Sequence, residues 1–212
     1  MGLAIAESLA AEGANVAMFA RRRELLEREA ERLGALAVRG DVTNSADLKR
    51  LVTRTLEAFG GIDILVNNSG GPPRTPAVGL TDEQVESAVE LLLLSAIRLT
   101  ALCLAQLERS GRGRVINIES SSVKEPIDNL ALSNAVRPGV VGWAKSLARE
   151  VGSRRSPSTR SRPAGSRPSA WPRPSRASRG RRTSRRSRSG ASGSRARWLT
   201  SSASSPRTRP RT

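Results

Sequence analysis

The 212-residue chain contains no histidine and no tyrosine, and it has only two phenylalanines and three tryptophans. Without histidine, a catalytic triad with an imidazole base is excluded, and without tyrosine no phenol can act as an acid. The single cysteine, Cys103, excludes a disulfide framework and a thiolate zinc site, and no other metal site is indicated. Cys103 falls on the apolar side of a predicted helix, where core packing is its expected role.

The sequence has no recognisable targeting or membrane-spanning segment. Glu7 and Glu12 interrupt the apolar residues that follow Met1, which argues against a signal peptide. The longest apolar stretch, residues 91–107, is interrupted by Arg98 and is too short to span a bilayer. We therefore expect a soluble, cytoplasmic protein with no membrane partner.

The formal net charge of +17 is concentrated in one part of the chain. Residues 1–152 carry 18 Lys and Arg against 19 Asp and Glu, whereas residues 153–212 carry 18 Arg and no acidic residue. The second part also contains 17 Ser and 7 Pro, with no Ile, Val, Phe or Met, so it cannot bury enough apolar surface to fold. The sequence predicts one domain over residues 1–152 and a disordered basic tail over residues 153–212.

Within residues 1–152, short apolar runs alternate with helical patterns. This alternation predicts an α/β fold with a doubly wound, Rossmann-like parallel sheet. We expect strands at residues 15–20, 36–42, 63–66 and 114–118. We expect helices at residues 3–11, 24–33, 45–59, 81–107 and 130–151, with Pro138 displacing the start of the last one. No strand pattern precedes the first helix, so we expect an incomplete sheet that lacks its first strand.

Three segments identify a family resemblance: GDV at residues 40–42, GIDILVNNSGG at 61–71 and GRVINIESSS at 113–122. In this order and at these distances they resemble the short-chain dehydrogenase/reductase family, over residues 1–152. The resemblance implies an oxidoreductase that transfers a hydride between a nicotinamide cofactor and a small carbonyl or alcohol substrate. Within this family, the chain is most similar to a divergent 3-oxoacyl-acyl-carrier-protein reductase-like group, in the sequences of residues 67–73, 122–126 and 132–150.

The resemblance also implies a set of cofactor-binding residues. In the family, a glycine-rich turn brings a helix N-terminus to the cofactor pyrophosphate. Here only Gly2 matches the end of that turn, so we expect the chain to be N-terminally truncated relative to the family. The other matching positions are Asp41 and Val42, at the family's adenine-binding pair, and Asn67, Asn68, Ser69 and Gly70, at its NNAG motif, where Ser69 replaces Ala.

Arg21 and Arg22 follow the strand predicted at residues 15–20. NAD-preferring enzymes of this fold carry an acidic residue near this point, whereas arginine can pair with the 2′-phosphate of NADP. We therefore expect NADP rather than NAD, with Arg21 and Arg22 as its contacts. The alternative is that both arginines are simply the solvated start of the next helix.

The family's catalytic residues are only partly matched. Ser120 matches the catalytic Ser, but Ser133 stands at the position of the catalytic Tyr, Arg137 at that of the Lys, and Leu92 at that of the supporting Asn. A serine hydroxyl is far less acidic than a phenol, and arginine binds ribose hydroxyls but does not exchange a proton. Lys124 is a further candidate acid, because a desolvated lysine titrates near neutrality; its alternative is an ordinary surface lysine.

Two interpretations of this site remain open, an unusual reductase and a relative that only binds ligands. Because the chain as given lacks the pyrophosphate turn and the family's C-terminal substrate region, we expect it to be inactive. Trp143 lies on a helix that corresponds to a subunit interface in the family, so a homo-oligomer is expected of an intact parent protein.

The arginine-rich tail also has two interpretations. It could bind nucleic acid nonspecifically by neutralising phosphates, which would make the chain a non-catalytic binding protein. Alternatively, it could be coding sequence read out of frame after about residue 152. With suitable synonymous codons, reading one base earlier converts residues 156–166 and 198–208 into segments similar to a late strand and a late helix of the family. The frameshift is the interpretation we prefer.

Overall fold

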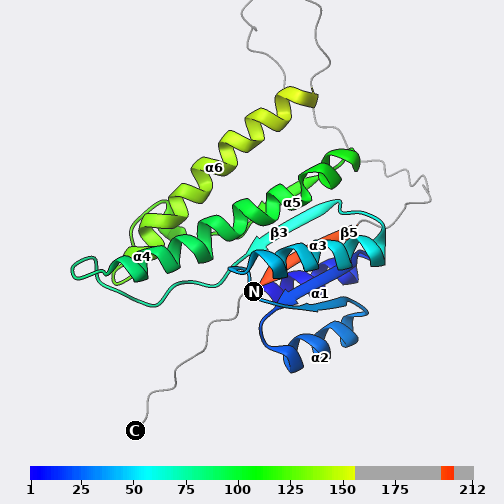
Figure 1. The fold of residues 1–212 in the computed structure, drawn as a ribbon, viewed down its shortest axis with the longest axis horizontal. Helices are drawn as coiled ribbons and strands as arrows, with labels where there is room; N and C mark the ends of the chain where they lie inside the picture. Colours follow the sequence, from blue (N-terminus) through cyan, green and yellow to red (C-terminus); the bar gives the residue numbers. More distant parts are fainter. Residues whose placement is uncertain (156–196, 203–212) are drawn as a thin grey trace, which may run out of the picture.

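The computed structural model describes residues 1–155 and 197–202, which form a five-stranded sheet with helices on both faces (Figure 1). The strand order is β2-β1-β5-β3-β4, and every neighbouring pair is parallel. This arrangement confirms the predicted doubly wound α/β fold. The strands are β1 (Asn15–Ala20), β2 (Leu36–Arg39), β3 (Ile64–Asn68), β4 (Arg114–Asn117) and β5 (Arg197–Ser202).

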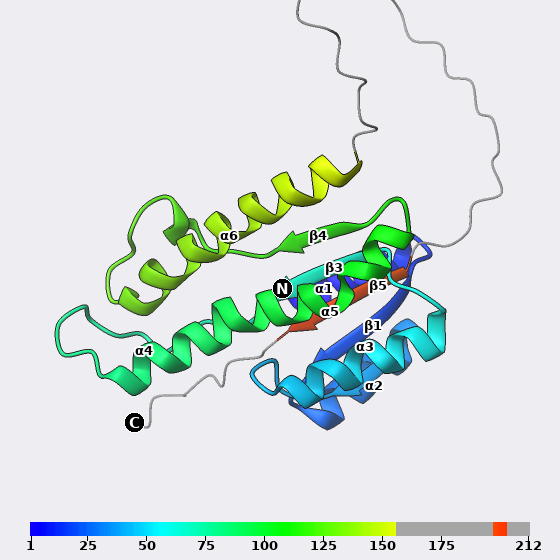
Figure 2. The same cartoon turned by 45° about the horizontal axis from the view of Figure 1, so that its top comes forward.

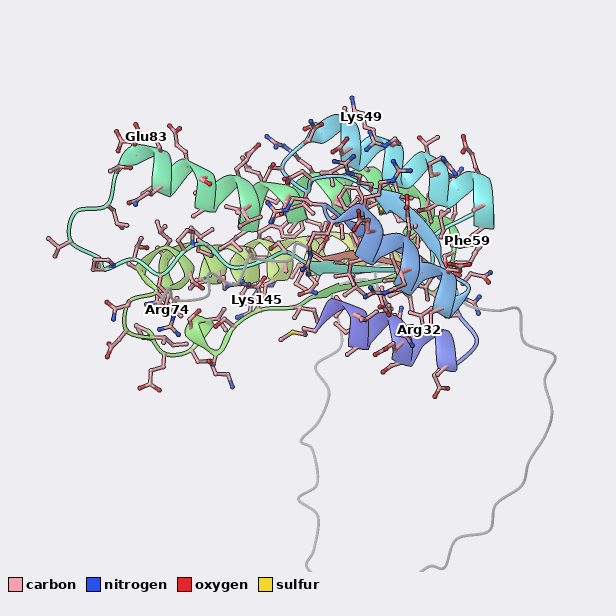
Figure 3. All side chains as sticks on the ribbon, turned by 90° about the horizontal axis from the view of Figure 1, so that it is seen from below. Arg32, Lys49, Phe59, Arg74, Glu83 and Lys145 are labelled. Atoms are coloured by element: carbon pink, nitrogen blue, oxygen red, sulfur yellow. The ribbon has the colours of Figure 1, made fainter. Side chains whose placement is uncertain are left out.

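Alternate residues of β1 face two separate cores. Val16 and Met18 pack in a cluster with α1 (Gly2–Ala11) and α2 (Arg23–Leu33). Phe19 packs on the other side with α3 (Ser45–Phe59) and α5 (Ser95–Arg109). Figure 3 shows α3, labelled at Lys49 and Phe59, on the same side as the start of the long helix near Glu83, with α1 on the opposite side. The other described helical segments are α4 (Asp82–Val89), the π-helical turn η1 (Glu90–Leu94), the 3-10 turn η2 (Ser121–Val123) and α6 (Ala131–Arg155).

Local sequence fixes several helix ends. The Asn44 side chain accepts hydrogen bonds from the backbone N–H groups of Ala46 and Asp47, at 2.9 and 3.2 Å, and so begins α3. Helices α2 and α3 both end in a left-handed glycine, Gly34 with φ of 60° and Gly60 with φ of 73°. These signals explain why the boundaries of both helices follow the sequence pattern closely.

The central strand is the main departure from the sequence analysis. We expected the sheet to lack its first strand and residues 153–212 not to fold, but β5 from that region lies between β1 and β3 (Figure 2). Residues 153–155 also continue α6. Without β5, the facing edges of β1 and β3 would be left unpaired. Backbone hydrogen bonding to these two edges therefore explains why residues 197–202 form a strand although the region contains few apolar residues. Residues 156–196 and 203–212, for which we also expected disorder, lie outside the described residues.

The Asp63 carboxylate anchors β5. It accepts hydrogen bonds from the backbone N–H and the Nε of Arg197, at 2.8 and 3.1 Å, and from the Ser110 hydroxyl at 2.6 Å. The Asp63 side chain is buried. Burial raises the pKa of Asp63, and the hydrogen bonds from Arg197 and Ser110 outweigh it and hold the pKa well below its ordinary value.

Segments α4, η1 and α5 run on as one helix of 28 residues, from Asp82 to Arg109. By length and composition alone, it is the one described helix that could cross a membrane, which corrects our expectation that the apolar stretch is too short. Leu99, Cys103 and Leu107 lie on the face of this helix that packs in the core with α3 and the sheet. The apolar residues of the helix therefore serve the packing of the domain.

Helix α6 differs from the sequence prediction in the effect of its proline. We expected Pro138 to displace the start of this helix, but α6 begins at Ala131 and contains Pro138 in its interior. The side chain of Asn134 bonds to the loop before the helix: it donates to the Ile127 carbonyl at 2.9 Å and accepts from the Ile127 N–H at 3.2 Å. These bonds hold the first turns of α6, and thus Ser133 and Arg137, in place ahead of the proline.

Candidate functional site

A cavity of about 530 Å³ opens at the carboxyl ends of the parallel strands. Cavities of roughly 300–1,000 Å³ at this edge of an α/β sheet are where such folds bind small ligands. This main cavity is lined from five directions: by Met1 and Gly2 at the start of α1, Ala20 at the end of β1, Arg22 and Glu29 before and within α2, Asn68 and Ser69 at the end of β3, and Ile118, Glu119, Ser120 and Arg137 after β4 and on α6.

Five of the predicted cofactor-binding residues meet in this cavity: Gly2, Arg22, Asn68, Ser69 and Arg137. They come from segments far apart in the sequence, and the parallel sheet brings them together because its strands end at one edge. The N-terminus of α1 is one of the walls, so its unpaired N–H groups and the positive end of the helix dipole lie at the cavity.

Arg21 and Asp41 line a neighbouring surface hollow instead, together with Arg39, Arg50 and Arg54. Arg21 Nη1 lies 3.7 Å from Asp41 Oδ2. The other carboxylate oxygen of Asp41 accepts hydrogen bonds from the backbone N–H and the hydroxyl of Thr43, at 3.0 and 2.9 Å. The Asp41 side chain thus organises its own loop, and the two arginines that the sequence treats alike lie in different places.

Two of the remaining predicted positions, Val42 and Asn67, are buried. Asn67 donates through Nδ2 to Asn117 Oδ1 at 2.8 Å and to Thr100 Oγ1 at 3.2 Å, which ties β3 to β4 and α5. Its Oδ1 is buried and has no hydrogen-bond partner among the described residues. Asn67, Val42 and Leu92 line a second cavity of about 10 Å³, the size of one water molecule. Gly70 follows Ser69 and is not part of the wall described for either cavity.

The predicted catalytic serines have unequal access to the main cavity. Ser120 is half-buried, lines the cavity, and accepts a hydrogen bond from the N–H of Ser122 at 3.2 Å. Ser133 is 5% exposed and lies behind the cavity, where its hydroxyl accepts from Arg137 Nε at 3.1 Å and lies 3.4 Å from the Ser122 hydroxyl. The structure therefore brings Ser120 and Arg137 to the cavity but not the hydroxyl of Ser133.

Lys124 ends the η2 turn and is exposed. It is not among the described residues that line the main cavity. The desolvation that would make this lysine a candidate acid is therefore absent from its surroundings.

Arg137 makes an ion pair that the sequence analysis missed. Its Nη1 donates to Glu119 Oε2 at 2.9 Å, and the two side chains are 10% and 17% exposed. Burial raises the pKa of Glu119, and the hydrogen bond and charge of Arg137 oppose that rise without cancelling it. One signal in the sequence could have revealed Glu119: it is a carboxyl directly after the strand predicted at residues 114–118 and directly before Ser120, in a chain without imidazole or phenol.

In the part of the chain that the structure describes, no group of three or more Asp, Glu, His or Cys side chains is placed to hold a metal ion. The polar groups of the main cavity are instead a helix N-terminus, two arginines, two carboxyls, an amide and hydroxyls. This set can bind an anionic, hydroxyl-bearing ligand and exchange protons with it.

Comparison with known proteins assigns the family. The family model described as short chain dehydrogenase matches residues 1–155. The chain belongs to the short-chain dehydrogenase family. An uncharacterized oxidoreductase of Mycobacterium bovis is 35% identical over 155 residues, which are 71% of this chain and 63% of the relative. The 3-oxoacyl-[acyl-carrier-protein] reductase of Escherichia coli is 34% identical over 158 residues, or 73% of this chain and 64% of the relative.

Among solved structures, the L-sorbose reductase of Gluconobacter frateurii, crystallised with NADPH and L-sorbose, aligns with this short-chain dehydrogenase with a TM-score of 0.68 and 31% identity. The alignment covers 71% of this chain and 60% of that protein. The chain thus spans less than two thirds of the length of these relatives. The match to residues 1–155 agrees with the family resemblance carried by residues 1–152.

Proposed function

We propose that the chain binds NADP(H) in the main cavity and transfers a hydride between this cofactor and a small carbonyl or alcohol substrate. This proposal replaces the inactivity expected from the sequence, because β5 occupies the centre of the sheet and the N-terminus of α1 lies at the cavity. The observation that carries the proposal is the cavity itself. One side of it offers the N-terminus of α1 and the guanidinium of Arg22, and another offers Ser120, Glu119 and Arg137. Anion-binding and proton-exchanging groups thus share one space of a size suited to a small ligand.

The residues present fit this cofactor. The first-turn N–H groups of α1 would receive the pyrophosphate, and Arg22 would pair with the 2′-phosphate. Asn68 and Ser69 would lie against the flat part of the cofactor, and Arg137 would hold ribose hydroxyls. The part of the cavity edge near the adenine ring would be supported by Asp41 and Val42, and Arg21 would act through its ion pair with Asp41. The part near the nicotinamide would be supported by Asn67 and Gly70. When bound, NADPH would supply a hydride to a substrate carbonyl that Ser120 orients by a hydrogen bond.

We further propose a 3-oxoacyl thioester as the substrate class. The names of the relatives support a carbonyl substrate, since both the enzyme from Escherichia coli and that from Gluconobacter frateurii are reductases. Self-association through α6, which carries the half-buried Trp143, is part of the same proposal.

The direct test is NADPH oxidation by the full chain, with a 3-oxoacyl thioester and a ketose as separate substrates. We expect Ser120→Ala to lower turnover about 100-fold, because a positioned group in the transition state contributes on the order of 10²–10⁴. Ser121→Ala is the matched control, since Ser121 is the exposed neighbour. NADPH binding without turnover on any carbonyl compound would instead support the inactive, binding-only alternative.

The rival function is nucleic-acid binding by the 18 arginines of residues 153–212. Such binding would weaken steeply with salt, because it releases counterions from phosphates. A region of this charge binds DNA whether or not it was selected to do so, so a binding assay alone does not separate the proposals. The nucleotide sequence of the gene does: the frameshift proposal fails if the frame one base earlier does not encode family-like segments at residues 156–166 and 198–208.

A further inference from the structure

A carbonyl reduction needs a proton donor as well as a hydride, and this chain has few groups that could be one. It has no tyrosine and no histidine. Cys103 is fully buried in the core, where burial raises the pKa of its thiol to about 12. Among the described residues, the ionisable side chains that line the main cavity are two arginines, Arg22 and Arg137, and two carboxyls, Glu29 and Glu119. Because arginine does not release its proton, only the carboxyls remain.

The two carboxyls lie in opposite surroundings. Glu29 accepts hydrogen bonds from Arg32 at 2.8 Å and from Arg28 at 3.1 Å, and these bonds hold its pKa below the ordinary value. Glu119 is 17% exposed and pairs with Arg137. Burial keeps the pKa of Glu119 above its ordinary value despite that partner. Glu29 therefore stays ionised near neutral pH, whereas Glu119 retains a larger protonated fraction.

We infer that Glu119 is the proton donor of this enzyme, in the place of the phenol that the sequence lacks; the inference rests on the proposed reductase function. It follows from geometry, since Glu119 lies in the cavity wall between Ile118 and Ser120, and Ser120 is the residue proposed to hold the carbonyl. Ser133, which replaces the family's tyrosine, is buried behind the cavity and is engaged by Arg137.

In the proposed step, the substrate carbonyl carbon would accept the hydride that bound NADPH supplies, and the electron pair of its C=O π bond would move to the oxygen. That oxygen takes the proton of the Glu119 carboxyl, which gives an alcohol and a Glu119 carboxylate. Arg137 Nη1, 2.9 Å from Glu119 Oε2, stabilises the carboxylate that forms. A solvent proton then restores the carboxyl, and the reverse sequence oxidises an alcohol.

Several charged groups line the main cavity around Glu119. Arg137 on α6 is its direct partner. Across the main cavity lie Arg22 and Glu29. A bound NADP(H) adds phosphate charge beside the N-terminus of α1, which would favour the protonated carboxyl. We therefore expect the pKa of Glu119 to rise further when NADPH binds.

The test combines a titration with kinetics. In the full chain with ¹³C-labelled glutamate, the carboxyl resonance that disappears in Glu119→Gln should titrate above the ordinary glutamate range, and at still higher pH with NADPH bound. In the kinetic assay, Glu119→Gln should lower turnover about 100-fold or more while its affinity for NADPH changes less than about threefold. Glu119→Asp, which keeps a carboxyl, should recover part of the turnover. Glu125→Gln, an exposed carboxyl on the same loop, is the control.

Each outcome decides between the two proposals. A wild-type chain that reduces no carbonyl compound refutes the reductase function and the donor role with it. An active wild-type chain whose Glu119→Gln variant keeps its turnover and pH profile refutes only the donor role. If the Gln variant does not fold, Glu119→Asp assigns the resonance instead, and the wild-type titration decides: a Glu119 resonance that titrates at or below the ordinary glutamate range overturns the inference.

Discussion

Arg21 and Arg22 are adjacent in the sequence but line different hollows in the structure. Arg22 precedes α2 and lines the main cavity, whereas Arg21 lies at the neighbouring hollow, 3.7 Å from Asp41. A cofactor in the main cavity would therefore contact Arg22 rather than Arg21. The structure therefore favours Arg22 as the contact that would distinguish NADPH from NADH, although both arginines fit the sequence pattern equally well.

The corresponding prediction concerns cofactor choice. Arg22→Ala should weaken NADPH binding about tenfold, equivalent to roughly 1.4 kcal/mol, and leave NADH binding nearly unchanged, because only NADPH carries the 2′-phosphate. Titration calorimetry with both cofactors measures this. The control is Arg23→Ala: Arg23 is exposed, pairs with Glu27, and is outside the described cavity wall. Equal losses for NADPH and NADH would show that Arg22 is not the discriminating residue.

The sequence indicates the position of a side chain most directly where one motif places it at the end of a strand. Ser120 and Asn68 follow the ends of predicted strands, so the shared edge of a parallel sheet brings them to the cavity. Glu119 could not be assigned in this way. Its role depends on Arg137, which reaches it from a helix 18 residues later, and on a burial that no local pattern reveals. Lys124 has the right chemistry in the sequence but lies exposed.

The strands and helices within residues 1–155 follow local patterns, and the sequence predicts most of their boundaries within a few residues. Strand β5 does not follow such a pattern. Its residues, RWLTSS, belong to a serine- and arginine-rich region with no apolar alternation, and its anchor Asp63 lies 134 residues away in sequence. Pairing with β1 and β3 along the whole strand determines its place. Such long-range pairing is not visible to any local analysis.

Asp63 provides the test of this element. Since the pKa of Asp63 is lower in the fold than in the unfolded chain, its contribution to stability is present above the ordinary carboxyl range and is lost as pH falls. Asp63→Asn should lower the free energy of unfolding by about 2 kcal/mol at pH 7, with a smaller difference at pH 3. Urea denaturation at the two pH values measures this change.

Asp128→Asn is the matched control for that experiment, because Asp128 is exposed in the loop before α6. We expect it to leave the free energy of unfolding unchanged within about 0.5 kcal/mol. If Asp63→Asn were equally neutral at pH 7, Arg197 would not be held by this carboxylate, and the placement of β5 in the sheet would lose its main support.

The molecule as a whole combines a continuous five-stranded sheet with a sequence that spans under two thirds of its relatives' length. The sheet is continuous because β5 occupies its centre. The overall charge of +17 says little about this fold, since residues 1–152 are almost neutral. The absence of tyrosine and histidine says more, because without them the two carboxyls of the main cavity, Glu29 and Glu119, are its candidate acids.

Calorimetric titration of the full chain with NADPH and NADH is the measurement that best tests whether this fold forms a cavity for NADP(H). We expect saturable binding of NADPH, one molecule per chain, with an affinity at least about tenfold higher than for NADH. Absence of NADPH binding by a folded chain, or a preference for NADH, would contradict it.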